Sequence, residues 1–129
     1  MMTEKFTVEI ITPDKSILKS DAQEVTIPSY EGEMGILKDH IPLITFLRPG
    51  FISIQNQDKK KYFVEEGTVE FSNNNLLILT STAKELKSFD KKYVNELLKD
   101  IDKKLQKNSL SDKEQYILSY KMNSLKEIN

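Results

Sequence analysis

Hydrophobic and polar positions alternate along the first part of the chain. Phe6, Val8 and Ile10 are separated by single polar residues, which is the period-two pattern of a strand with one buried face. Shorter alternating or apolar runs follow between Pro, Gly and Asn turn signals, at 17–18, 25–27, 43–47, 51–54, 62–64, 68–71 and 76–79. Many short strands at close spacing predict a β sandwich, in the form of a flattened antiparallel barrel.

The hydrophobic period changes to about 3.6 residues, that of a helix, near residue 89. A cap at Ser88 or Asp90, and a capping box formed by Ser111 and Glu114, indicate the starts of two helices. We expect them to form an antiparallel hairpin. The residues expected in its core are Leu97, Ile101, Leu118 and Leu125, together with the aromatic residues Phe89, Tyr93, Tyr116 and Tyr120.

The distribution of charge changes at the same place as the period. Residues 1–86 carry 9 basic and 13 acidic side chains, whereas residues 87–129 carry 10 basic and 7 acidic ones. The net charge therefore changes from −4 to +3 between the two parts. We expect an N-terminal β-sandwich domain over 1–86 and a C-terminal α-helical hairpin over 87–129.

The segment from Pro28 to Gly50 is rich in turn-forming residues. It holds six of the chain's eight glycines and prolines, and Gly32 and Gly35 are placed where a positive φ would cost little. Its many apolar residues distinguish it from a linker, which would be polar throughout. We therefore expect a shaped loop that packs on its surroundings and leads into the strand at 43–47.

Composition excludes several classes of function. The chain has a net charge of −1 and no cysteine, so we expect neither nucleic-acid binding nor a disulfide or thiolate metal site. The three lysines at 59–61 are interpreted as a solvated turn. No run approaches the roughly 18 apolar residues that span a bilayer, and the N-terminus lacks a targeting pattern. We expect a soluble, unprocessed protein that reaches a membrane only through its partners.

His40 and the acidic residues Glu31 and Glu33 are the candidates for chemistry. His40 follows Asp39, but no second base or nucleophile motif accompanies them, so catalysis is not expected. Glu31 and Glu33 could bind a cation or form an exposed docking loop. A hard cation needs several more oxygen ligands at fixed spacing, and none is apparent, so docking is the preferred interpretation.

The run EGEMGILKDHIPLITFLRPG, followed by YFVEEGTVEFSNNNLLILTSTA, resembles the epsilon subunit of bacterial F-type ATP synthases over nearly the whole chain. The positions that match the family's Gly-Glu-Leu-Gly-Ile-Leu-Pro-x-His-x-Pro-Leu segment are Gly32, Glu33, Gly35, Ile36, Leu37, His40, Pro42 and Leu43. Met34 replaces the Leu and Lys38 the Pro. The resemblance implies a non-catalytic rotor subunit of the central stalk, peripheral on the cytoplasmic face of the bacterial inner membrane.

The resemblance also implies partners for particular segments. The loop residues Glu31, Gly32 and Glu33 would contact the c-subunit ring, and the segment His40, Ile41, Pro42 and Leu43 would contact the gamma subunit. Two helices of roughly 40 residues would extend to roughly 60 Å. An extended hairpin could therefore reach the alpha and beta subunits and inhibit ATP hydrolysis. The alternative from another class is a free-standing β-sandwich module that binds proteins other than gamma.

Some members of this family bind ATP through an Ile/Leu-Asp-x-x-Arg-Ala motif at the start of the first helix, with an acidic residue six positions before the Asp. Asp90 is retained here, whereas Tyr93 replaces the Arg and Lys84 replaces the acidic residue. We expect no nucleotide and no other cofactor, and Asp90 is interpreted as a remnant of the motif.

Overall fold

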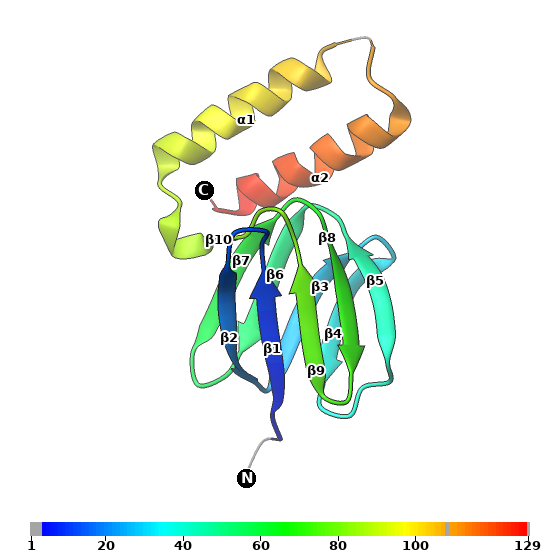
Figure 1. Cartoon of the computed structure of the whole chain (residues 1–129). Helices are drawn as coiled ribbons and strands as arrows, with labels where there is room; N and C mark the ends of the chain where they lie inside the picture. The colour runs from blue at the N-terminus through cyan, green and yellow to red at the C-terminus, as the bar shows by residue number, and fades with distance from the viewer. Residues whose placement is uncertain (1–3, 108, 129) are drawn as a thin grey trace.

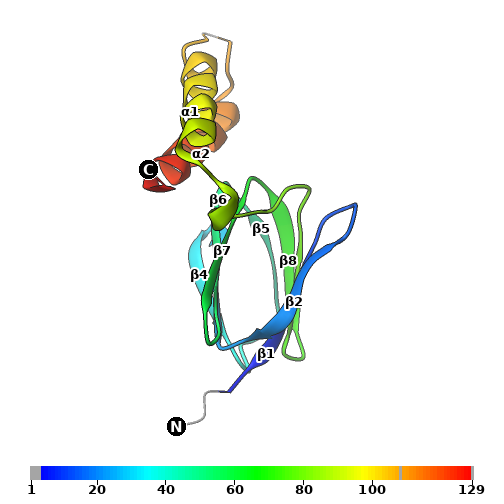
Figure 2. The same cartoon turned by 90° about the vertical axis from the view of Figure 1, so that its left-hand side faces the viewer.

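Two layers of strands form the body of the protein, and a helical hairpin covers one end of them (Figure 1, Figure 2). The structure is a computed structural model that describes residues 4–107 and 109–128. The elements are β1 (Phe6–Ile11), β2 (Ser16–Ala22), β3 (Glu24–Ser29), β4 (Gly32–Leu37), β5 (Leu43–Leu47), β6 (Gly50–Gln55), β7 (Lys59–Val64), β8 (Gly67–Ser72), β9 (Asn75–Leu79), β10 (Lys84–Glu85), the 3-10 turn η1 (Leu86–Ser88), α1 (Lys91–Leu105) and α2 (Asp112–Ile128). The predicted fold class is confirmed.

The strands form one sheet that curls into two layers. β4, β3, β6, β7 and β10 make one layer, and β5, β8, β9, β1 and β2 make the other. The layers are joined where Ser29 of β3 pairs with Leu47 of β5. The pairs between described strands are antiparallel except that of β1 with β9, which is parallel. β1 therefore lies between β9 and β2, and β2 forms the edge of the second layer.

Inward-facing side chains from both layers form the core of the sandwich. The alternation predicted for the first strand is confirmed, since Phe6, Val8 and Ile10 are buried. The ring of Phe6 meets that of Phe71 edge to face, with centroids 5.6 Å apart. The largest fully buried side chains of this core are Phe71, Ile10, Ile27, Ile36, Leu47, Ile52, Leu76 and Ile78.

The segment 28–50 contains more regular structure than we expected. β4 pairs with β3 along its whole length, where a shaped loop was predicted. Gly32 has a φ of 122°, as expected at a turn, but Gly35 lies within β4 without a positive φ, so that expectation was wrong. Met34 and Ile36 do face inward with period two. The glycines beside them have low strand propensity, which hid the alternation.

A smaller difference concerns the lysines at 59–61. They open β7 and pair with Ser53, Ile54 and Gln55 of β6, so the turn between these strands is shorter than we expected. A polar run is typical of a turn, but exposed edge positions of a strand tolerate charged side chains equally well. Composition alone therefore did not distinguish the two.

The helices bury a second cluster against the first layer. Val94, Ile101 and Leu125 are buried and pack with Phe63 of β7. α2 lies between α1 and the strand ends in both views (Figure 1, Figure 2). The hairpin thus has a core of its own, to which the sandwich contributes one buried ring.

Both helix starts follow the predicted capping. The Asp90 carboxylate accepts a hydrogen bond from the Tyr93 amide at 2.7 Å, which identifies Asp90 as the cap of α1. Ser111 accepts from the Glu114 amide at 3.1 Å, and the Glu114 carboxylate accepts from the Ser111 amide at 3.3 Å. The capping box is therefore confirmed. Neither helix, over the residues described, is long and apolar enough to cross a membrane.

Candidate functional site

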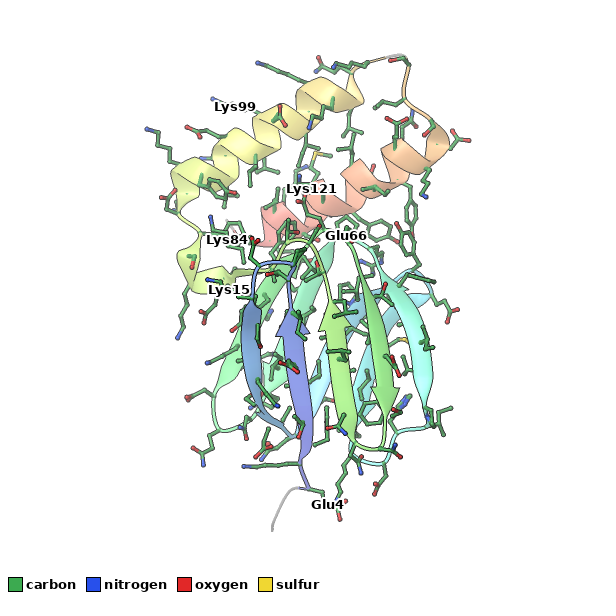
Figure 3. The ribbon with its side chains drawn as sticks, in the orientation of Figure 1. Glu4, Lys15, Glu66, Lys84, Lys99 and Lys121 are labelled. Carbon is green, nitrogen blue, oxygen red and sulfur yellow. The ribbon has the colours of Figure 1, made fainter. Side chains whose placement is uncertain are left out.

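The two segments expected to contact partners lie at opposite ends of the sandwich. The segment 30–33, which we call the β3–β4 turn, comprises the two residues between these strands and the first two residues of β4. It lies at the end that the hairpin covers, because Tyr30 stacks on Tyr116 of α2. The segment 38–42 lies at the far end, where Lys38 is 3.9 Å from Glu4. Figure 3 shows Glu4 at the end away from the helices. The structure therefore separates the two segments rather than bringing them together.

The β3–β4 turn is exposed at its tip and firmly attached at its base. Glu31 and Glu33 are exposed, and the Glu31 amide donates to the hydroxyl of Ser29 at 3.1 Å. Ser29 is buried and shares a 2.9 Å hydrogen bond with the hydroxyl of Thr45. The Tyr30 amide donates to the Phe46 carbonyl at 3.1 Å. The carboxylates are thus presented to solvent from a backbone that is fixed by hydrogen bonds.

The acidic residues of this turn do not form a metal site. In the part of the chain that the structure describes, no group of three or more His, Asp or Glu side chains could hold a metal ion. A divalent cation would need more oxygen ligands than Glu31 and Glu33 supply. The arrangement suits a contact with a polar surface.

His40 and Asp39 are not coupled as a catalytic pair. Asp39 adopts a φ of 65°, and its carboxylate accepts from the Asn74 side chain at 3.0 Å while its amide donates to Asn74 Oδ1 at 2.7 Å. His40 Nδ1 donates to the Ile41 carbonyl at 2.7 Å, and its ring lies edge-on to Phe71. Both side chains fix the loop between β4 and β5.

An exposed apolar surface continues from this loop along β5. Ile41 is 74% exposed, Ile44 71% and Phe46 60%. We call these three residues the apolar face. Large apolar side chains that gather on a surface commonly mark a protein contact. Ile44 and Phe46 were expected to pack on their surroundings and were not predicted as partner contacts. The sequence did carry a signal, because apolar residues occupy both alternating sets of positions in 43–47 and one set of a strand faces outward.

Tyrosines of α2 contact the sandwich rather than the core of the hairpin. Tyr116 stacks on Tyr30 with centroids 5.9 Å apart and planes at 14°, and it meets Tyr120 at 4.7 Å. The guanidinium of Arg48 lies 4.1 Å from the centre of the Tyr120 ring. We call Tyr30, Arg48, Tyr116 and Tyr120 the tyrosine cluster. A hydrogen bond with Tyr120 is the main cause that raises the pKa of Tyr116.

The expectation that these tyrosines join the hairpin core was therefore wrong, and it was also wrong for Tyr93, which is 38% exposed. Of the four aromatic residues, Phe89 does pack against the buried cluster. The amphipathic ring of tyrosine is as well suited to a half-exposed contact with a cation or another ring as to a core. Helical period alone does not distinguish the two.

The four aliphatic residues expected between the helices lie in one cluster. Ile101 and Leu125 are fully buried, and Leu97 and Leu118 are partly buried beside them. This cluster is what holds α1 and α2 together.

A pocket of about 400 Å³ is lined by residues of the hairpin and of the sandwich, beside their direct contacts. Lys15, Lys84, Lys121 and Glu66 gather around this junction (Figure 3). Lys121 forms an ion pair with Glu65 of the sandwich. Charged side chains thus border the pocket, and the ion pair between Lys121 and Glu65 neutralises two of them.

The positions that depart from the ATP motif contact each other in this pocket. The Lys84 ammonium lies 3.8 Å from the centre of the Tyr93 ring and 4.9 Å from that of Phe89. This is a cation–π contact that anchors the start of α1 to the sandwich. Asp90 is engaged as the helix cap. The residues present do not fit the nucleotide motif, because Tyr93 stands in the place of its arginine and contacts Lys84.

Comparisons with known proteins agree with this architecture. The family model described as ATP synthase, Delta/Epsilon chain, beta-sandwich domain matches residues 5–86. The ATP synthase epsilon chain of Pelagibacter ubique is 45% identical over 130 residues, which cover 99% of this chain and 100% of that one. The mitochondrial ATP synthase subunit delta of Schizosaccharomyces pombe is 39% identical over 99 residues, which cover 74% of this chain and 59% of that protein.

A similar fold occurs in a solved assembly. A chain in the cryo-EM structure of the Euglena gracilis mitochondrial ATP synthase, OSCP/F1/c-ring in rotational state 1, superposes with a TM-score of 0.80. The match covers 95% of this chain and 80% of that one at 23% sequence identity, so it shows the shared fold. Because the family model matches most of the sandwich and a full-length relative is 45% identical, the chain belongs to the family of ATP synthase epsilon chains.

Proposed function

We propose that the chain is a non-catalytic rotor subunit of the central stalk of a proton-translocating F-type ATP synthase, where it links the gamma subunit to the c-subunit ring. The observation that carries this proposal is the 45% identity to an ATP synthase epsilon chain along the whole length of both proteins. As part of such a complex, it would lie peripherally on the cytoplasmic face of the bacterial inner membrane. A subunit that transmits torque needs a rigid body with partner surfaces, and a tightly packed sandwich supplies one.

The gamma subunit is proposed to bind His40, Ile41, Pro42 and Leu43, together with the outer side of β5. The apolar face supports this assignment, since Ile41, Ile44 and Phe46 are mostly exposed in the chain by itself. Burial of each large apolar side chain against a partner would contribute about 1.5–3 kcal/mol before the entropy of association is subtracted. A partner segment with apolar side chains at this point is therefore expected.

The c-ring is proposed to bind the β3–β4 turn through Glu31, Gly32 and Glu33. The exposed carboxylates and the hydrogen-bonded base of the turn support a polar contact with loops of the ring. Such a contact would be sensitive to salt, because exposed ion pairs are screened.

Single-cysteine crosslinking tests both assignments, since the native chain has no cysteine. Ile44→Cys should crosslink to gamma in the assembled enzyme, and Glu31→Cys should crosslink to the c subunit. Lys19→Cys, on the exposed side of β2, is the matched control and should crosslink to neither. The assignment fails if the three variants give the same products, and the rotor proposal fails if the tagged chain purifies from membranes without gamma.

Two substitutions of glycine test whether the geometry of the turn matters for coupling proton flow to ATP synthesis. Gly32→Val places a β-branched residue at a φ of 122°, which costs about 1–3 kcal/mol and should redirect the tip. We expect reduced ATP synthesis driven by a proton gradient. Gly35→Ala is the control, because its added Cβ would meet only an oxygen of Glu24 at an ordinary 3.5 Å. Equal synthesis in both variants would remove the turn from the mechanism.

We further propose a regulatory role for the hairpin, in which residues 87–129 form a unit that can leave the sandwich of residues 1–86. The separate cluster of Leu97, Ile101, Leu118 and Leu125 supports this division. In an extended form the helices would approach the alpha and beta subunits and lower ATP hydrolysis. Hydrolysis should be compared among the intact chain, the Leu118→Ala, Leu125→Ala double variant and a chain without residues 88–129. Equal rates in all three would exclude inhibition.

A further inference from the structure

The tyrosine cluster connects α2 to the β3–β4 turn at a place separate from the core of the hairpin. The buried hairpin cluster meets the sandwich at Phe63 of β7. The tyrosine cluster instead meets it at Tyr30, the residue next to Glu31. Tyr30 is 40% exposed and Tyr116 38%, so the stack lies at the surface. The hairpin therefore touches the turn directly, besides resting on the sheet.

The second acidic residue of the turn also faces α2. Glu33 lines a groove of about 330 Å³ with Arg48 on the sandwich side and with Tyr120, Asn123 and Glu127 on the α2 side. α2 thus forms a wall of the groove beside Glu33, while its Tyr116 covers Tyr30. Both flanks of the exposed tip are in contact with, or close to, the same helix.

The backbone of the turn can transmit this contact. The amides of Tyr30 and Glu31 donate to Phe46 and Ser29 respectively, so opening of the turn breaks hydrogen bonds that can be followed. A stacked aromatic pair changes an equilibrium constant by about two- to tenfold. A factor of this size is enough to shift the opening equilibrium of the turn measurably, and small enough to be reversed when the hairpin moves.

We propose that α2 braces the β3–β4 turn through the Tyr30–Tyr116 stack, so that the position of the hairpin sets the mobility of this turn. Its consequence for the enzyme rests on the proposed contact of the turn with the c-ring. By linkage, a partner that holds the turn in its closed form also stabilises the hairpin on the sandwich. Binding of the turn to the c-ring and docking of the hairpin on the sandwich then stabilise each other. Release of the hairpin makes the β3–β4 turn more mobile.

Hydrogen exchange by NMR in the isolated full-length chain tests the brace without any partner. Tyr116→Ala should speed exchange of the Tyr30 and Glu31 amides about two- to tenfold, because the stack is lost. Tyr116→Phe keeps the ring and should leave their exchange unchanged. Gln115→Ala, at the exposed neighbouring position of α2, is the matched control and should also leave it unchanged. Unchanged turn exchange in Tyr116→Ala would overturn the proposal.

A reciprocal variant covers the case in which Tyr116→Ala unfolds α2. Tyr30→Ala removes the partner ring from the turn, and it should speed exchange of amides around Tyr116 and Tyr120. If exchange in α2 stays at the native rate in that variant, the stack does not couple the two elements and the proposal is wrong. Failure of Glu31→Cys to crosslink to the c subunit would instead remove the proposed docking function and leave the exchange results, and the brace, intact.

Discussion

Leu125 offers a direct measure of how independently the hairpin is held. Its side chain is fully buried in the hairpin cluster, with Ile101 and the partly buried Leu118 around it. Truncation to Ala should cost about 2–5 kcal/mol, because it removes buried methyl groups and leaves a cavity. Helices as short as α1 and α2 are marginal when isolated in water, so a loss of this size is comparable to the whole free energy that keeps them docked.

Native-state hydrogen exchange distinguishes opening of the hairpin from unfolding of the chain. In Leu125→Ala, protection of amides in α1 and α2 should fall by about 30-fold or more, whereas that of β1 amides around Ile10 should stay at the native level. Leu79→Ala is the control, since Leu79 is 45% exposed on β9 and should change neither set appreciably. If helix and strand amides lose the same protection in Leu125→Ala, the two clusters unfold as one unit and the division is refuted.

Three further substitutions test other parts of the structure. Gly50→Ala should lower the free energy of unfolding in urea by about 1–3 kcal/mol, because the new Cβ would lie 2.6 Å from that of Pro28; an unchanged midpoint would refute the clash. Burial raises the pKa of Tyr62 in the folded chain above its ordinary value near 10. Folding therefore favours the neutral phenol, and this contribution to the free energy of unfolding is present below about pH 10 and is lost as the pH rises through the raised pKa. Tyr62→Phe should therefore lose less stability than the native chain between about pH 9 and 11 in alkaline denaturation, and equal losses would contradict this. Lys84→Gln should expose the start of α1 to faster exchange, since the contact with Tyr93 is lost, while equal exchange would show that the contact is not stabilising.

Local patterns predicted the elements whose signals lie within their own sequence. β1 was evident because its buried residues alternate without interruption, and α1 and α2 because their caps and stripes agree. β4 was missed because Gly32 and Gly35 weaken its pattern. β10 was not predicted either, since it consists of Lys84 and Glu85 and is defined by pairing with β7. A strand of two residues is defined by its pairing with another strand, and the local sequence does not indicate which strand that is.

The contact surfaces could be predicted only in part for the same reason. The turn residues Glu31 and Glu33 were found because a charged, glycine-flanked segment implies exposure. The stack of Tyr30 on Tyr116 was not, because helical period indicates which face of α2 is amphipathic and not which distant residue it meets. Lys84 and Tyr93 were noted separately as departures from a motif, and their mutual contact required the fold.

The hydroxyl of Ser29 has a mechanical consequence for the docking end of the molecule. β3 is the strand where the two layers meet, and Ser29 at its end pairs with Leu47, bonds to Thr45 across the junction and accepts from the Glu31 amide. A sideways force on the tip of the turn is therefore divided between both layers at its first point of attachment. Such a force must break several hydrogen bonds at the same time. A force carried by β4 alone would instead separate this edge strand from β3 one hydrogen bond after another.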